Sequence, residues 1–77
     1  MNGIGWAVKQ MRAGRSVRRA GWNGKGMSLE IMPGDTLCAV RGFLPQKYVA
    51  MVTTQATMVP WLCSQTDLLA MDWEIAE

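Results

Sequence analysis

The chain has 77 residues and a formal net charge of +2 at pH 7, which fits one domain (residues 1–77) with a modest hydrophobic core. It contains no histidine, so the commonest general base and the usual zinc ligand are both absent. We therefore expect a binding protein rather than an enzyme, with no metal and no cofactor. A domain this small commonly gains stability by forming a homo-oligomer.

The N-terminus lacks the basic and apolar regions of a signal peptide, and no apolar run approaches the length of a membrane span. We expect a cytosolic protein. Its two cysteines, Cys38 and Cys63, lie far apart and form no Cys-x-x-Cys pair, which favours reduced structural thiols but leaves a single disulfide open. Seven methionines and four tryptophans are many for this length, and both residue types are favoured at subunit interfaces.

The charges are distributed unevenly along the chain. Residues 1–29 carry six cations and no acid, whereas residues 30–77 carry two cations and six acids. The two parts therefore have net charges of +6 and −4. Two interpretations stay open: the basic part pairs with the acidic part within or between subunits, or it attracts an anionic ligand.

The first predicted element is an amphipathic helix between Asn2 and Gly14. Asn2 is the predicted N-cap, and Gly14 stands where a glycine commonly ends a helix. Trp6 falls on the face opposite the apolar stripe, which predicts an exposed side chain that contacts another subunit or a ligand. The stripe follows the i, i+3, i+4, i+7 spacing and consists of Ile4, Ala7, Val8 and Met11.

Two short strands follow, separated by a glycine-rich loop. Arg15–Ala20 is predicted as a strand with Val17 turned inward, and Met27–Met32 alternates with period two. The loop Gly21–Met27 contains the Asn-Gly pair typical of a hairpin turn. A phosphate-binding loop of the P-loop or dinucleotide-fold type needs a helix directly after it, and here a strand follows instead.

The rest of the chain predicts further strands and a short helix. Lys47–Thr54 has apolar residues on both faces, which indicates a central strand or one covered by a partner. Thr57–Leu62 is the next strand, and its proline should lie at an edge or a strand end. Ser64 is the predicted N-cap of a helix over Gln65–Met71, with Asp67 at the capping-box position.

A last strand over Asp72–Ala76 places Trp73 and Ile75 on one face, which favours a core position for Trp73. Gln55-Ala56 has a poor composition for a turn, so the boundary between the two preceding strands is not well defined. Together the elements predict an α+β fold: an N-terminal helix packed on a small antiparallel sheet, with a short C-terminal helix.

The loop Gly21–Met27 admits two interpretations. It is either an ordinary hairpin turn, or a turn that also holds a ligand, with exposed N–H groups for an anion, Trp22 for a base and Lys25 as a mobile cation. Catalysis is disfavoured because the cysteines lack a histidine base. Asp67 and Asp72 are explained more simply as a helix cap and a surface acid than as a catalytic pair.

The loop and a second motif carry a resemblance to a phage protein family. The chain closely resembles the Thoeris anti-defence proteins of the second described type at Gly21-Trp22-Asn23-Gly24-Lys25-Gly26-Met27, followed by Val59-Pro60-Trp61 and by Ser64-Gln65-Thr66-Asp67-Leu68-Leu69-Ala70 with Asp72-Trp73. The similarity covers most of the chain in the family's order. Two departures are a segment from Thr36 to Tyr48 that looks shorter than in many relatives, and Trp6 in place of a polar residue.

The resemblance implies a small α+β protein that assembles into a homotetramer in the cytoplasm of the infected bacterial host. Such proteins bind cyclic nucleotide immune signals, notably a glycocyclic ADP-ribose isomer made by Thoeris defence, and hold them without cleavage. Some also bind cyclic oligonucleotides of CBASS defence. The same role is implied here, with neither a membrane nor nucleic acid as partner.

The resemblance also implies a set of ligand-binding residues. Trp22 would stack on the base, while Lys25 and the glycine-loop N–H groups meet phosphate oxygens and Arg19 supplies a second cation. Trp61 is either a second stacking plate or a core residue. The full set is Arg19, Trp22, Asn23, Gly24, Lys25, Gly26, Met27, Trp61, Ser64, Gln65, Thr66 and Asp67.

Two other functions remain as alternatives. One is a small nucleic-acid- or protein-binding module that uses the basic N-terminal part and Trp22. The other is a hydrolase of cyclic nucleotides, which the missing catalytic groups disfavour.

Overall fold

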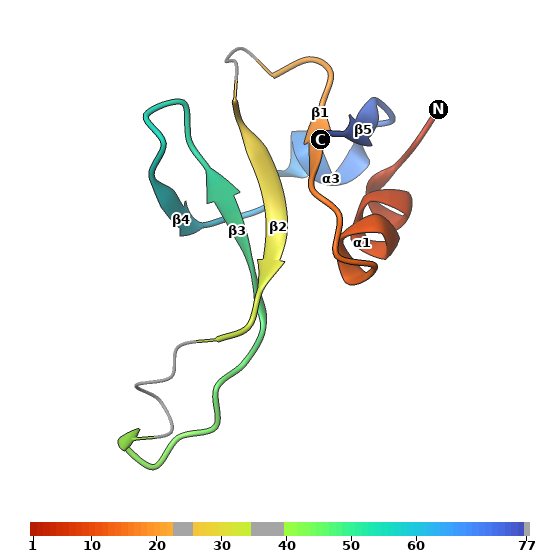
Figure 1. Ribbon diagram of the computed structural model, residues 1–77. Coiled ribbons are helices and arrows are strands. Elements are labelled where there is room, and N and C mark those ends of the chain that lie inside the picture. Colours follow the sequence, from red (N-terminus) through yellow and green to blue (C-terminus); the bar gives the residue numbers. More distant parts are fainter. Residues whose placement is uncertain (23–25, 35–39, 77) are drawn as a thin grey trace.

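The computed structural model describes residues 1–22, 26–34 and 40–76. These residues form the predicted α+β architecture, with five strands in one antiparallel sheet of order β4-β3-β2-β1-β5 (Figure 1). The helices and strands in this part of the chain are α1 (Ile4–Arg12), β1 (Val17–Arg19), β2 (Ser28–Met32), β3 (Tyr48–Val52), β4 (Met58–Pro60), α3 (Gln65–Leu69) and β5 (Trp73–Ile75).

One face of the sheet carries the core. Val17 of β1 pairs with Leu29 of β2 and with Ile75 of β5, and side chains of directly paired residues lie on the same face. Val17, Leu29 and Trp73 are buried on this face, where Ala7 and Met11 of α1 pack against them. The inward Val17 and the core position of Trp73 are therefore confirmed.

Helix α1 has the predicted apolar stripe, but its N-cap is Gly3, without a side-chain cap. Asn2 instead pairs with the segment that leads into β5: its backbone N–H donates to the carbonyl of Met71 at 3.1 Å, and its Nδ2 donates to the carbonyl of Trp73 at 3.2 Å. The predicted Asn2 cap is wrong because this long-range pairing engages the side chain elsewhere.

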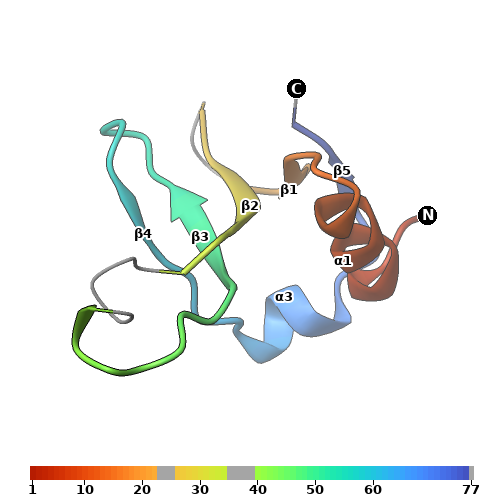
Figure 2. The ribbon, with the colours of Figure 1, turned by 60° about the horizontal axis from the view of Figure 1, so that its bottom comes forward.

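The end of α1 is as predicted, since Gly14 follows the helix with a φ of +88°, a conformation that favours glycine. The predicted exposure of Trp6 is wrong. Its side chain is partly buried and packs against the core. Helix α1 contacts β5 and α3 as well as β1 and β2, so it buries a wider arc than the apolar stripe alone (Figure 2).

The predicted strands are present with shorter bounds. Strands β1 and β2 form an antiparallel pair, as the hairpin interpretation requires, but Asn23, Gly24 and Lys25 lie outside the described residues. Strand β3 lies between β2 and β4, so the central-strand alternative is confirmed. Strand β4 is at the sheet edge and ends at Pro60, also as predicted.

A three-residue turn joins β3 to β4 despite its poor turn composition. The backbone N–H of Thr53 donates to the carbonyl of Thr57 at 2.8 Å, and their hydroxyl oxygens lie 2.6 Å apart. Ala56 has a φ of +60°, the left-handed conformation that a three-residue hairpin loop needs at its last position. The sequence signal is weak because alanine occupies a position where glycine is usual.

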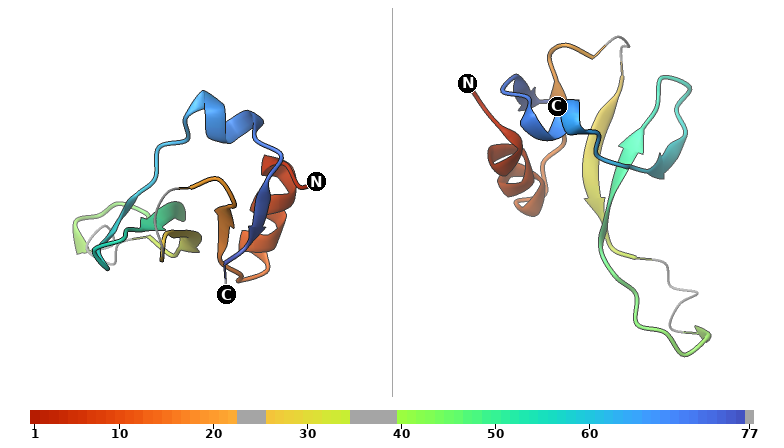
Figure 3. Two further views of the ribbon diagram at one scale, coloured as in Figure 1. Left: turned by 90° about the horizontal axis from the view of Figure 1, so that it is seen from above. Right: turned by 180° about the vertical axis from the view of Figure 1, so that it is seen from behind.

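The connection over residues 61–72, which contains helix α3, crosses from β4 at one edge of the sheet to β5 at the other (Figure 3). Helix α3 ends at Leu69, two residues before the predicted end, where Ala70 has an extended backbone. Its apolar residues Leu68 and Leu69 are exposed. Among the described residues, no helix is long and apolar enough to cross a membrane.

Candidate functional site

Three tryptophans form the centre of the candidate site. Trp73 is buried, and the rings of Trp22 and Trp61 meet it edge-to-face, at centroid distances of 5.5 Å and 6.0 Å. The two interplanar angles are 79° and 86°, the geometry that aromatic pairs prefer. Trp22 and Trp61 come from the two motifs, so the fold brings both motifs to one buried ring.

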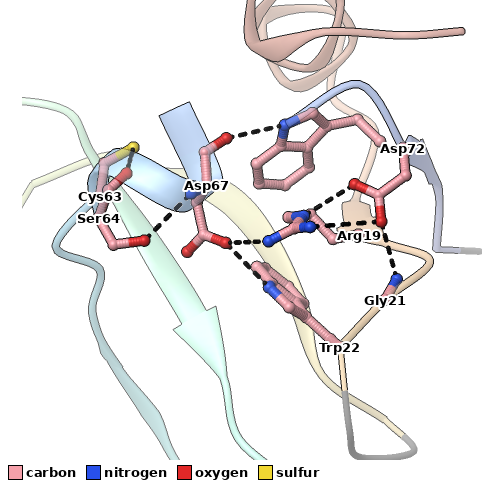
Figure 4. Close-up of polar contacts among 8 residues, drawn as sticks. Arg19, Gly21, Trp22, Cys63, Ser64, Asp67 and Asp72 are labelled. Carbon is pink, nitrogen blue, oxygen red and sulfur yellow. Dashed lines mark hydrogen bonds and ion pairs between the residues drawn. The ribbon is translucent and has the colours of Figure 1, made fainter. Parts of the chain in front are cut away.

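Arg19 lies beside this aromatic cluster on the core face of the sheet. It pairs with Trp73 across β1 and β5, two residues along from the buried Val17. A guanidinium in this position needs hydrogen-bond acceptors, and two carboxylates supply them. Nη1 donates to Oδ1 of Asp67 at 2.8 Å, and Nε donates to Oδ1 of Asp72 at 2.8 Å (Figure 4).

Both carboxylates also bind the start of the glycine loop. Oδ2 of Asp72 accepts the backbone N–H of Gly21 at 2.9 Å, and Oδ1 of Asp67 accepts Nε1–H of Trp22 at 3.3 Å. The backbone carbonyl of Asp67 accepts Nε1–H of Trp73 at 3.2 Å. The indoles of Trp22 and Trp73 are therefore both anchored to α3 through one residue.

The ion pairs shift the pKa values of Arg19, Asp67 and Asp72 in the directions that favour the charged forms. Bonds from Asp72 and Asp67 raise the pKa of Arg19. Partial burial raises the pKa of Asp67, but the hydrogen bonds from Arg19, Trp22 and Ser64 outweigh this and hold it below the usual range. The Arg19 bond, aided by the Gly21 N–H, lowers the pKa of Asp72. Both acids are therefore ionised at neutral pH.

The second motif builds the start of α3. Ser64 is the N-cap, as predicted, and its hydroxyl accepts the backbone N–H of Asp67 at 3.1 Å. Gln65 and Thr66 are exposed in the first turn. Cys63, next to them, is a free and exposed cysteine, and the small burial of its thiol, together with the nearby Asp67, raises its pKa. Cys38 lies outside the described residues.

The remaining predicted site residues are placed only in part. Gly26 is exposed with a φ of +86°, and Met27 is partly buried. Asn23, Gly24 and Lys25 lie outside the described residues, so their part in the site stays a prediction. Sequence reasoning missed Gly21 and Asp72 as partners, since Asp72 was interpreted as a surface acid. No local pattern signals contacts between residues so far apart in the chain.

Some of the positive charge of residues 1–29 is neutralised within the chain by acids of residues 30–77. Arg18 pairs with Glu74 at 3.2 Å on the exposed face, and Arg19 pairs with Asp67 and Asp72. The first of these pairs is half-exposed and contributes little to stability. Among the described residues, no group of three or more potential metal ligands occurs.

A concave surface lies away from the aromatic cluster. It is an open groove of about 710 Å³ between the C-terminal part of α1, the end of β2 and the start of β3. Val8, Met11 and Ile31 are among its apolar lining residues, while Arg12 and Lys47 add positive charge. None of the predicted ligand-binding residues that the structure describes lines it.

Comparison with known proteins identifies the family. The model of the Thoeris anti-defense 2-like domain (Tad2-like) matches residues 2–76 of this chain. The protein named Thoeris anti-defense 2 of Bacillus phage SP01 is 35% identical over 81 residues, covering 94% of this chain and 91% of that protein. The resemblance carried by the two motifs is thereby confirmed. The chain belongs to the Thoeris anti-defense 2-like family, whose role is phage anti-defence.

Proposed function

We propose that this protein binds a cyclic nucleotide immune signal of the glycocyclic ADP-ribose type and sequesters it without cleavage in the cytoplasm of the infected host. The observation that carries the proposal is the position of Trp22. Its indole, near the start of the loop Gly21–Met27, is anchored by Asp67 and Trp73, so an aromatic face is fixed immediately before the loop residues whose N–H groups we expect to bind an anion.

The ligand's chemistry matches these groups. An adenine ring can stack on Trp22, and the phosphates can bind Lys25 and the loop N–H groups. The exposed first turn of α3 supplies Ser64, Gln65 and Thr66 for ribose hydroxyls. Because the chain has no histidine, the usual general base for cleavage is missing, which favours holding the ligand intact.

Self-association, as a homotetramer, is part of the proposal. Tightly bound ligands are usually buried over most of their surface, and one loop alone would leave most of the ligand exposed to solvent. Several large apolar side chains are exposed in the single chain, including Phe43, Leu44, Leu62 and Leu69. Burying them against further copies would remove apolar surface from water and could enclose the ligand between subunits.

A sequestration experiment tests the proposal. The purified protein is mixed with glycocyclic ADP-ribose, separated from free ligand, and then heat-denatured. We expect the intact cyclic molecule to be released in an amount that matches the protein sites. Release of only a linear product would refute sequestration and favour a hydrolase. Light scattering on the same sample measures the number of subunits, and a monomer would refute the tetramer.

The groove next to α1 favours one alternative function, a nucleic-acid-binding module that uses Arg12 of the basic N-terminal part together with Lys47. Arg12 and Lys47 could contact phosphates there, and Tyr48 offers a ring. Binding to a single-stranded oligonucleotide with a steep salt dependence would support this alternative. We expect no such binding at physiological salt.

A further inference from the structure

Arg19 is the centre of a closed set of contacts around the start of the glycine loop. Its side chain is only 18% exposed, and its fork binds two separate carboxylates: Nη1 faces Asp67, while Nε and Nη2 face Asp72 at 2.8 Å and 3.5 Å. Each carboxylate then holds one of the next residues of the loop. Asp72 binds Gly21, and Asp67 binds Trp22 (Figure 4).

The packing at Gly21 shows how close these contacts are. A Cβ atom at this position would lie 3.1 Å from Oδ2 of Asp72 and 3.7 Å from Nη2 of Arg19. The first distance is tighter than an ordinary contact, so a side chain here would displace the carboxylate. Glycine therefore allows the loop backbone to approach the ion pairs.

The charges of this cluster argue against direct phosphate binding by Arg19. Its single positive charge faces two negative charges, so the cluster as a whole is negative. A phosphate would have to displace a carboxylate from a bonded guanidinium. The sequence-based role of Arg19 as a second cation for the ligand is therefore less consistent with the geometry than a structural role toward Trp22.

We propose that Arg19 is a positioning residue, which holds Asp67 and Asp72 so that they fix Gly21 and orient the indole of Trp22 for ligand stacking. The inference rests on the proposed function. An arginine suits this role, because its planar fork reaches two carboxylates in a fixed arrangement, whereas a lysine ammonium has no such fork.

The test compares Arg19→Lys, which keeps the charge, with Arg19→Gln, which removes it. Arg12→Gln is the matched control, because it removes a cation from the distant groove. We expect both Arg19 variants to weaken binding of glycocyclic ADP-ribose by roughly tenfold or more, and we expect Arg19→Lys, which keeps the charge, to retain the wild-type dependence of Kd on salt. Arg12→Gln should keep the wild-type affinity. Wild-type affinity in Arg19→Lys, so that only Arg19→Gln weakens binding, would overturn the inference, because the charge alone would then suffice.

A measurement without ligand separates this inference from the proposed function. The Nε1–H signal of Trp22 in a nitrogen–proton NMR spectrum is assigned by its loss in Trp22→Phe. In both Arg19 variants we expect the signal to shift and to exchange faster with water, since the Asp67 acceptor is no longer fixed. An unchanged signal would overturn the positioning role. Failure of the wild-type protein to bind the signal would instead refute the proposed function.

A second variant covers the case in which the Arg19 variants do not fold. Gly21→Ala leaves the ion-pairing residues in place and pushes on Asp72 from the loop side. We expect weaker ligand binding and a shifted Trp22 signal in the folded protein. Unchanged affinity together with an unchanged indole signal would show that the loop does not depend on these contacts.

Discussion

The replacement Trp22→Ala tests the candidate site most directly. It removes the aromatic face that we expect to stack on the base of the ligand, and it leaves the glycines and Lys25 of the loop and all of helix α3 unchanged in sequence. Trp6→Ala is a suitable control, since Trp6 is also partly buried against the core but comes from α1 and does not belong to the predicted set of ligand-binding residues.

Two separate magnitudes follow from the contacts of Trp22. Loss of a base-stacking face costs roughly 1–3 kcal/mol of binding free energy, which weakens Kd by about 5- to 150-fold. Loss of the edge-to-face contact with Trp73 and of the bond to Asp67 should each lower the free energy of unfolding by about 0.5–1.5 kcal/mol. The variant should therefore be folded but less stable.

Isothermal titration calorimetry with glycocyclic ADP-ribose measures the first quantity, and urea unfolding measures the second. We expect Trp22→Phe to bind with intermediate affinity, because it keeps a ring but loses the donor to Asp67. Trp6→Ala should lose stability and keep its affinity. If Trp22→Ala binds within about twofold of the wild type, stacking on this residue contributes nothing and the reasoning fails.

Four further predictions concern stability and charge. Trp73→Ala should lower the free energy of unfolding in urea by about 3–5 kcal/mol, because it empties the centre of the core; a loss below about 1 kcal/mol would contradict that position. Ala56→Gly should raise the free energy of unfolding by about 0.5–1 kcal/mol, since relief of left-handed strain exceeds the added entropy of glycine; calorimetry should show a higher Tm, and a lower Tm would contradict the strain. The lowered pKa values of Asp67 and Asp72 mean that their stabilising contribution is complete above about pH 5 and is lost as pH falls below about 4; Asp67→Asn should flatten this part of the stability curve, and an unchanged acid dependence would count against the ion pair. Lys25→Gln should weaken ligand binding and reduce its salt dependence, measured by titration at two ionic strengths, whereas an unchanged salt dependence would remove Lys25 from the phosphate contacts.

Periodicity predicted most of the fold because each element presents a regular apolar pattern to one core. The spacing of the stripe in α1 and the alternation in β1, β2 and β5 predicted which side chains face inward, and Met11, Val17, Leu29 and Trp73 are buried accordingly. The Ser64 cap was also predictable, because its acceptor and the Asp67 N–H are only three residues apart. Local patterns therefore identified the elements and several of their ends.

The errors arose where distant segments meet. Asn2 pairs with the segment before β5, and Trp6 is covered because α1 touches β5 and α3. Asp72 lies within reach of Arg19 and Gly21 because β5 pairs with β1. Each of these contacts joins residues about 50 or more positions apart or depends on how whole elements pack. A pattern within one element cannot specify them.

The ion pairs show which positive charges of the basic part are already paired near the site. Arg18 and Arg19 belong to the basic part of the chain, yet both pair with acids of the C-terminal part. Positive charge near the loop therefore does not come from Arg19 as an unpaired cation. An anionic ligand at Trp22 would depend on Lys25, on the backbone N–H groups or on a neighbouring subunit. The net negative charge of the Arg19, Asp67 and Asp72 cluster opposes every anion near Trp22, so these positive groups and base stacking together have to outweigh that repulsion.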